Sequence, residues 1–366
     1  MKKKFFTTLV IFIIATIIYL LLGIWGIFEI KKNSNFLFRN QENFLFHKKY
    51  SEKIHHLRDA NRWGLKRNEY LFSIINENEK KTILFQGDSW IESISEIKNS
   101  QNLLEQFGID NKFNIYNAGV TSFAPSLMHK QYEILKKDFK IIPNILVIYI
   151  DQTDIGDEFC RYKDNKIYSD DGIFKGVKRE RFTRATYDYS KLYMYSELNF
   201  DSNLEKLLKF PYKKTLYFIN RNINQVKNII NNGYKNRNIT KCSFKEIMKE
   251  LTNYNLDSEN NFKTSLKEYL ETLYLEKNIE EIYLVSFPHK KHLDNSYQIN
   301  VSDYIDDVIN SNKDDRLVHL NMSKLEFDKL KIEKIYKKND LASHLTDEYH
   351  TKLFMKNILL NLKKKK

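Results

Sequence analysis

The chain has 366 residues, of which 42% are hydrophobic and 14% aromatic. This is enough apolar material for a packed core and excludes a disordered chain. The formal net charge is +13, but the basic residues are spread along the sequence rather than gathered into one stripe, so the composition does not favour binding to nucleic acid.

The amino terminus has the pattern of a membrane anchor. Lys2, Lys3 and Lys4 precede an uncharged run from Phe5 to Phe28, which is long enough to cross a hydrocarbon core of about 30 Å. A cleaved signal peptide would have a shorter core and a small-residue cleavage site. We therefore expect residues 1–30 to form an uncleaved transmembrane signal anchor, with the basic tip in the cytoplasm and the body of the chain across the membrane.

A juxtamembrane segment, residues 31–78, precedes a regular alternation of apolar strands and amphipathic helices. This alternation is typical of a parallel sheet covered on both faces, so we expect an α/β fold with five parallel strands. The predicted strands cover residues 82–85, 113–117, 145–150, 282–287 and 316–320. The helices expected between and after them run from about 90 to 107, 126 to 139, 262 to 275 and 350 to 362.

The alternation is interrupted by residues 161–261, which are charged, aromatic and irregular. We expect a mostly helical insertion that forms a lid or cap, flanked by the two parts of the α/β domain, 79–160 and 262–366. The two cysteines, Cys160 and Cys242, could bridge in an oxidising compartment, but two lone cysteines this far apart are more often unpaired. Their spacing does not fit a metal site.

Reactive side chains follow the predicted strands at their carboxyl ends, where open α/β sheets place their sites. Ser89 follows the first strand, and a serine nucleophile needs a base that a carboxylate orients. The alternative is that Asp88 and Ser89 only cap the next helix. Gly119 follows the second strand, where a backbone amide could face an oxyanion, and His344 lies between the last strand and the last helix.

Four short motifs in this order resemble the SGNH (GDSL-like) hydrolase superfamily. They are Gly87-Asp88-Ser89, Asn117-Ala118-Gly119, the turn at 151–154, and the block that runs from His344-Leu345-Thr346-Asp347 to His350. The resemblance covers residues 79–160 and about 265–362. It implies a flavodoxin-like, three-layer α/β/α sandwich and ester hydrolysis or acyl transfer through an acyl-serine, with no metal or other cofactor. By that resemblance Ser89 is the nucleophile, His344 is the general base, and the amides of Ser89 and Gly119 belong to the oxyanion hole.

Two departures from the family pattern concern the site. Thr153 stands where the family has an asparagine that donates to the oxyanion, so the Thr153 hydroxyl or the Gln152 amide would have to replace it. Asp340 precedes His344 by four positions, whereas Asp347 precedes His350 by the usual three. We favour His344 as the base, with Asp340 as its orienting carboxylate. His350 is then expected on the surface of a helix, and a triad of Asp347 and His350 is the alternative.

The remaining candidates have two interpretations each. Asp154, Asp157 and Glu158 cap or line the cleft, or bind a cation. His289 and His292 are expected to be solvated, although they could touch substrate. Asp88 and Trp90 could line the site, with Trp90 stacked on a sugar face or packed in the core. The tyrosines of the insertion, among them Tyr195, form either a glycan platform or the lid's own core.

Together these features predict a membrane-anchored serine esterase that removes O-acyl groups, above all O-acetyl groups, from a surface polysaccharide or peptidoglycan. The first alternative is an O-acyltransferase that uses the same serine and receives its acyl group from an envelope-biosynthesis partner. The second is a catalytically inactive protein that binds glycan or helps to assemble an envelope complex.

Overall fold

A computed structural model describes residues 2–34, 41–55, 72–75, 81–177, 194–232, 244–252, 255–293, 299–311, 314–324, 332–340 and 342–364. The chain forms two compact units. The first consists of Met1–His55, Asp59–Glu69 and Arg179–Arg237, and the second of His56–Arg58, Tyr70–Lys178 and Asn238–Lys366.

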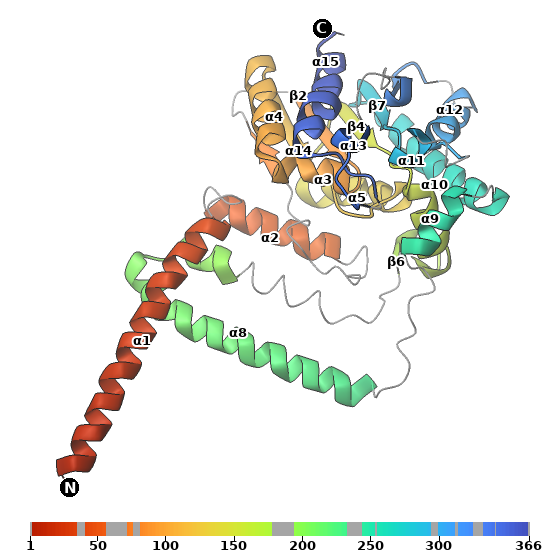
Figure 1. Ribbon diagram of the computed structural model, residues 1–366. Helices are drawn as coiled ribbons and strands as arrows, with labels where there is room; N and C mark the ends of the chain where they lie inside the picture. Colours follow the sequence, from red (N-terminus) through yellow and green to blue (C-terminus); the bar gives the residue numbers. More distant parts are fainter. Residues whose placement is uncertain are drawn as a thin grey trace. The chain divides into compact units, whose positions relative to one another are not determined.

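The first unit is helical (Figure 1). Its helices are α1 (Lys2–Ser34), α2 (Gln41–His55) and α8 (Asn203–Asn232). Within α1, the 29 residues Lys4–Lys32 are long and apolar enough to cross a membrane. A small core joins α1 to the segment before α8 and to α8 itself through Ile30, Met194, Tyr195, Leu198 and Phe210. Tyr195 is therefore packed in a core with α1, so of its two interpretations the glycan platform is wrong and the core is shared with α1 rather than being the insertion's own.

The second unit contains a six-stranded, mostly parallel sheet in the order β1-β3-β2-β4-β7-β8. The strands are β1 (Phe72–Ile74), β2 (Lys81–Gln86), β3 (Phe113–Asn117), β4 (Ile145–Tyr149), β7 (Glu281–Ser286) and β8 (Leu317–Asn321). Each of the five predicted strands is present, and all neighbouring pairs among them are parallel. The prediction of five strands is wrong by one, because β1 adds an antiparallel edge strand beside β3.

Both faces of β2 are covered by helices, which explains its apolar sequence. Ile83 and Phe85 belong to a core that includes α3 (Ser89–Glu96), α4 (Lys98–Asn111) and α15 (Lys356–Lys364). On the other face the Gln86 side chain meets α5 (Pro125–Phe139) and α10 (Leu256–Tyr274) by bonding Gln131 and Tyr269. Gln86 is fully buried, so these partners are what make a polar side chain tolerable there.

The other elements of the second unit are short. After β4 come α6 (Asp154–Gly156), η2 (Asp157–Tyr162), η3 (Lys163–Asn165) and the hairpin β5 (Lys166–Tyr168) with β6 (Phe174–Val177). Further along the chain are α9 (Phe244–Thr252), α11 (Lys290–Leu293), α12 (Val301–Ser311), η4 (Met322–Lys324), α13 (Ile332–Ile335), α14 (Asp347–Tyr349) and η5 (His350–Met355).

The predicted insertion 161–261 is divided between the two units, since its middle part, Arg179–Arg237, belongs with α1. Its role as a lid stays a prediction. Cys160 is disulfide-bonded, so the expectation of an unpaired cysteine is wrong. The chain's other cysteine, Cys242, lies outside the described residues.

Candidate active site

Ser89 is the first residue of α3, directly after the turn that follows β2. The Asp88 side chain caps this helix by accepting the Trp90 amide at 2.9 Å. Gly87 lets the turn come close to the sheet, because a Cβ there would lie 2.6 Å from Ile91 and 3.0 Å from Tyr149. The capping interpretation is therefore correct for Asp88, whereas the Ser89 hydroxyl faces a histidine.

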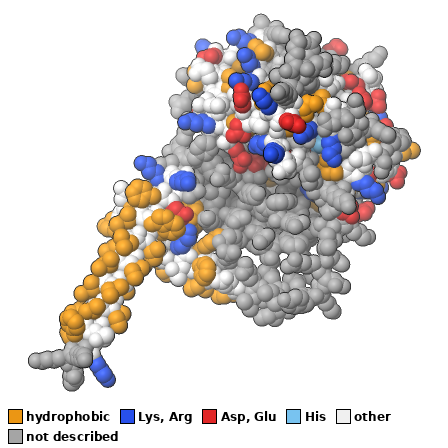
Figure 2. Space-filling model, in the orientation of Figure 1, with side chains coloured by type: hydrophobic (Ala, Val, Ile, Leu, Met, Phe, Trp, Pro, Cys, Tyr) orange, Lys and Arg blue, Asp and Glu red, His pale blue; other side chains and the backbone are white. Residues whose placement is uncertain are grey.

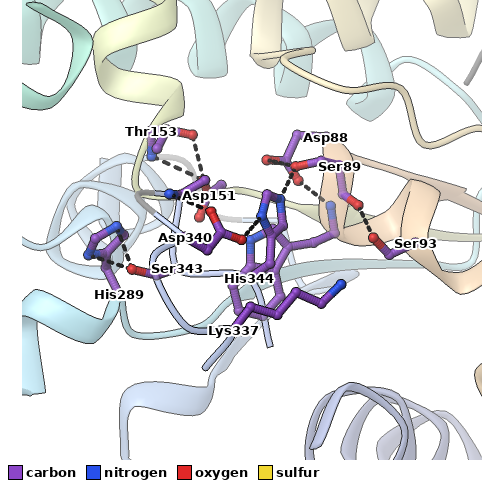
Figure 3. A network of polar contacts seen from close by, with 12 residues as sticks. Asp88, Ser89, Ser93, Asp151, Thr153, His289, Lys337, Asp340, Ser343 and His344 are labelled. Carbon is purple, nitrogen blue, oxygen red and sulfur yellow. Dashed lines mark hydrogen bonds and ion pairs between the residues drawn. The ribbon is translucent and has the colours of Figure 1, made fainter. Parts of the chain in front are cut away.

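Ser89, His344 and Asp340 form a continuous hydrogen-bonded chain (Figure 3). The Ser89 Oγ lies 2.6 Å from His344 Nε2, and His344 Nδ1 lies 2.6 Å from Asp340 Oδ2. A carboxylate can only accept, so Nδ1 carries the proton and Nε2 is left to accept from the serine hydroxyl. This is the arrangement in which a histidine can act as general base toward a serine.

Electrostatics support an ionised Asp340. Burial raises the pKa of Asp340, but the hydrogen bond from His344 and the charge of that ring outweigh it, so the net pKa is below the ordinary value. The amide of Ala342 also donates to Asp340 at 2.9 Å. An ionised carboxylate at this position stabilises the imidazolium that forms when the histidine takes a proton.

The loop that carries Asp340 and His344 explains how a spacing of four reaches the same geometry. Asn339 and Ser343 adopt left-handed backbone conformations, with φ of 60° and 58°. The loop is closed by bonds from the Lys337 amide to the His344 carbonyl and from the Thr346 amide to the Ile335 carbonyl, each 2.8 Å long. The two left-handed residues turn the chain back on itself, so that Asp340 lies against the ring it precedes.

The alternative pair, Asp347 and His350, is not at the serine. His350 is buried, and its ring contacts Ser100 Oγ at 2.9 Å and the Trp90 carbonyl at 3.0 Å. Burial lowers the pKa of His350 to about 4, so the ring is neutral at physiological pH. Asp347 forms an exposed ion pair with Lys337. The expectation that His350 lies on a helix surface is wrong, because its ring is buried against the Trp90 carbonyl of α3.

The other donors predicted for the oxyanion hole each form a hydrogen bond with a nearby acceptor. The Gly119 amide donates to Asn117 Oδ1 at 3.0 Å, and a Cβ on Gly119 would lie 2.2 Å from the Glu92 amide nitrogen. The Thr153 hydroxyl donates to Asp151, and the Gln152 amide donates to the Ile299 carbonyl at 2.7 Å. These bonds compete with a role in an oxyanion hole, and the predicted donors, the amides of Ser89 and Gly119 and the Thr153 hydroxyl, stay a prediction.

Acidic side chains gather behind the nucleophile. Asp88, Asp151 and Asp154 are buried, and burial raises the pKa of each. Repulsion from neighbouring carboxylates raises the pKa of Asp88 and Asp154 further, whereas hydrogen bonds from Thr153 oppose the rise at Asp151. Asp154 accepts the Asp151 amide at 3.0 Å through one oxygen, and its other oxygen has no hydrogen-bond partner among the described residues. The cluster therefore favours protonated carboxyl groups.

The cation interpretation of the turn after β4 is not supported. Glu158 accepts the Ser126 amide at 2.7 Å and pairs with Lys166 at 3.2 Å, while Asp157 pairs with Arg161 at 3.0 Å. Within the described ranges no group of three or more His, Cys, Asp or Glu residues could hold a metal ion. These carboxylates tie the turn to its neighbouring helices.

Near the site, Trp90 and His289 are buried and His292 is half-buried. Trp90 packs against Tyr149, Phe287 and Phe354 at centroid distances of 5.2, 5.3 and 5.4 Å, so it belongs to the core and not to a sugar platform. His289 contacts Ser343 at 2.8 Å, and His292 contacts the Ile299 carbonyl. The expectation that both histidines are solvated is wrong.

A second Ser-His-Asp row was not predicted. Ser286 Oγ lies 2.8 Å from His319 Nε2, and His319 Nδ1 lies 2.6 Å from Asp306. Ser286 is fully buried at the end of β7 and also bonds Ser302, so no substrate reaches it. The same distances thus occur at a structural site, and accessibility separates the two serines.

The Asp154→Asn variant tests the protonated cluster. Because the pKa of Asp154 is raised in the folded state, its contribution to stability is present below pH 4 and is lost as the pH rises toward the folded-state pKa. We expect urea unfolding of the full chain in detergent to show a smaller loss of stability between pH 5 and pH 8 in Asp154→Asn than in the wild type. The difference should be about 1.4 kcal/mol for each pKa unit.

The exposed Asp110→Asn variant on α4 is the control and should follow the wild-type pH dependence. Parallel pH dependences for the wild type and Asp154→Asn would contradict a protonated Asp154.

No protein-family model and no curated protein match the sequence. Among solved structures, the fold is similar to a family two carbohydrate esterase from Clostridium thermocellum in complex with cellohexaose, with a TM-score of 0.37 and 10% identity. It is also similar to an acetyl xylan esterase (Est2A) from the rumen bacterium Butyrivibrio proteoclasticus, with a TM-score of 0.36 and 8% identity. Each match covers 80% of this chain and about two thirds of the other, 66% and 65%.

Proposed function

We propose that this chain is a membrane-anchored serine esterase that removes O-acetyl groups from a cell-envelope polysaccharide. The observation that carries the proposal is the partly exposed Ser89 hydroxyl, 2.6 Å from a histidine that Asp340 orients. In this mechanism His344 takes the Ser89 proton as Oγ attacks the ester carbonyl, and it returns the proton to the departing sugar hydroxyl. Water then attacks the acyl-serine, with His344 again as the base, and acetate leaves.

We also propose that the second unit is a three-layer α/β/α sandwich of SGNH type. The order of Ser89 after β2, Gly119 after β3 and His344 before the last helices supports this assignment, as does the helical cover on both faces of β2.

The body of the chain is proposed to lie outside the cytoplasm, where a glycan substrate would be. The disulfide at Cys160 supports this placement, because disulfides persist in oxidising compartments. The basic residues Lys2 to Lys4 before the apolar span support it as well.

The second candidate function is a catalytically inactive glycan-binding or assembly protein. It is favoured by the bonds that occupy the Gly119 amide and the Thr153 hydroxyl, since a missing oxyanion donor costs about 10²–10³-fold in rate.

A fluorophosphonate probe, which reacts with activated serines, separates the two candidates. The full-length protein in detergent should label at Ser89, the Ser286→Ala control should label equally, and Ser89→Ala should not label. The same three proteins are then assayed for acetate release from an O-acetylated polysaccharide, with and without sugar acceptors, which also detects acyl transfer. A folded wild type that neither labels nor releases acetate would favour the inactive candidate.

A further inference from the structure

Helix α8 exposes a long apolar stripe. Its members are spaced three or four residues apart, so they share one face of the helix: Leu204, Leu208, Tyr212, Leu216, Ile219 and Ile223. Their exposed fractions run from 39% at Leu216 to 65% at Leu204. A soluble surface rarely leaves so continuous an apolar row open to water.

The rest of the helix surface is divided between a polar face and a contact face. By helical spacing Lys206 and Lys213 lie on the side away from the stripe, and Lys209 lies between them and the edge of the stripe. Lys209 is exposed and pairs with Asp201 and Glu205. The contact face, with Leu207 and Phe210, lies against α1. Helix α8 is thus amphipathic and basic, in the manner of helices that lie in a membrane interface.

The contact between α8 and α1 is close because α1 carries two glycines there. A Cβ on Gly23 would lie 2.2 Å from the Leu207 carbonyl oxygen, and one on Gly26 would lie 2.2 Å from the Phe210 ring. The Tyr19 hydroxyl also donates to the Leu208 carbonyl at 2.5 Å. The contact therefore falls on the second half of the apolar span, and α8 runs across α1 rather than along it (Figure 1).

Charged and amphipathic side chains surround the end of the apolar span of α1. Lys214 of α8 lies 3.3 Å from Glu29 and 5.1 Å from the centre of the Trp25 ring, and the Tyr195 hydroxyl donates to Glu29 at 2.7 Å. Tryptophan, tyrosine and paired charges are typical of the boundary between hydrocarbon and water. Figure 2 shows hydrophobic side chains covering α1 up to the region where charged groups begin.

We propose that α8 lies in the plane of the bilayer interface, on the same membrane that α1 crosses, with its apolar stripe in the acyl boundary. This inference rests on the proposed anchor role of α1. The stripe begins beside α1 with Leu204 and Leu208, so lipid around α1 would contact these two residues, and the rest of the stripe continues away from α1 along the same bilayer surface. The lysines on the opposite face then point toward lipid headgroups and water, and they favour an anionic surface.

The experiment uses the full-length chain in vesicles of phosphatidylcholine and phosphatidylglycerol. Ile219→Cys on the stripe and Lys206→Cys on the polar face are each labelled with a nitrobenzoxadiazole dye, and spin-labelled lipids serve as quenchers. The wild type is the labelling blank, because its Cys160 is disulfide-bonded. We expect a blue-shifted dye at position 219 that loses at least about twice as much emission to the lipid quencher as the dye at position 206.

Equal quenching at both positions would overturn the proposal. A blue-shifted dye at 219 that the lipid quencher does not reach would also overturn it, since protein would then cover the stripe. A third variant, Phe12→Cys in α1, separates this inference from the anchor on which it rests. Quenching at 12 without quenching at 219 rejects the interfacial helix alone, and absence of quenching at 12 rejects the anchor and the interfacial helix together.

Discussion

Replacing His344 by alanine is expected to lower kcat for ester hydrolysis by about 10⁴-fold or more, because the Ser89 hydroxyl then has no base. Asp340→Asn should lower it by about the same order, since an amide can hold Nδ1 in the wrong tautomer. The measurement is steady-state hydrolysis of a model acetate ester by the full-length protein in detergent.

His350→Ala and His319→Ala are the matched controls. Both rings are held by two polar contacts each, as His344 is, but neither contacts Ser89. We expect them to lower thermal stability while the folded fraction keeps kcat within about ten-fold of the wild type. Loss of activity in His350→Ala with full activity in His344→Ala would move the base to His350 and reject the arrangement described above.

The sheet could be predicted from the sequence because its strands are short, apolar and regularly separated by amphipathic helices. Residues 113–117 were delimited as the structure has them, and the other four strands differ by one residue at one or both ends. The edge strand Phe72–Ile74 has only three residues, and no period can be read from so few. This segment becomes a strand because it pairs with β3, and the local sequence does not show that long-range pairing.

The positions of the main site residues could be predicted, because they follow from where the strands end and from the order of the motifs along the chain. Ser89 and His344 lie 255 positions apart, yet each lies where an open sheet brings reactive groups together. The partners of individual donors were not predictable. The Asn117 side chain, two residues before Gly119, accepts a hydrogen bond from the Gly119 amide. The Thr153 hydroxyl donates to Asp151. Such local bonds compete with the oxyanion, and the sequence does not show which acceptor prevails.

The sequence also does not show which histidines are buried. Histidine is intermediate in its tendency to be buried, so the sequence is equally compatible with buried and with exposed positions for His350 and His289. Each is buried because a specific partner, Ser100 or Ser343, satisfies its ring. The same holds for α8, whose amphipathic pattern is visible in the sequence, while its contact with Gly23 and Gly26 appears only in three dimensions.

Replacing Trp90 by alanine is expected to cost about 3–5 kcal/mol in the free energy of unfolding, the usual range for a large aromatic side chain removed from a core. Trp90 is 2% exposed and packs against Tyr149, Phe287 and Phe354. It also follows Ser89 directly and lies 6.2 Å from the His344 ring, centre to centre, so the cavity would form behind the nucleophile and its base. Urea unfolding of the full-length protein measures the loss.

Trp90→Phe separates packing from substrate binding. The indole Nε1 has no hydrogen-bond partner among the described residues, so phenylalanine gives up volume but no polar bond. We expect Trp90→Phe to keep most of the stability and to leave KM for an acetylated glycan within about two-fold of the wild type. A large rise in KM with unchanged stability would mean that the indole touches sugar and would contradict its place in the core. A loss of stability in Trp90→Ala with KM unchanged in Trp90→Phe is what a buried side chain that supports α3 predicts.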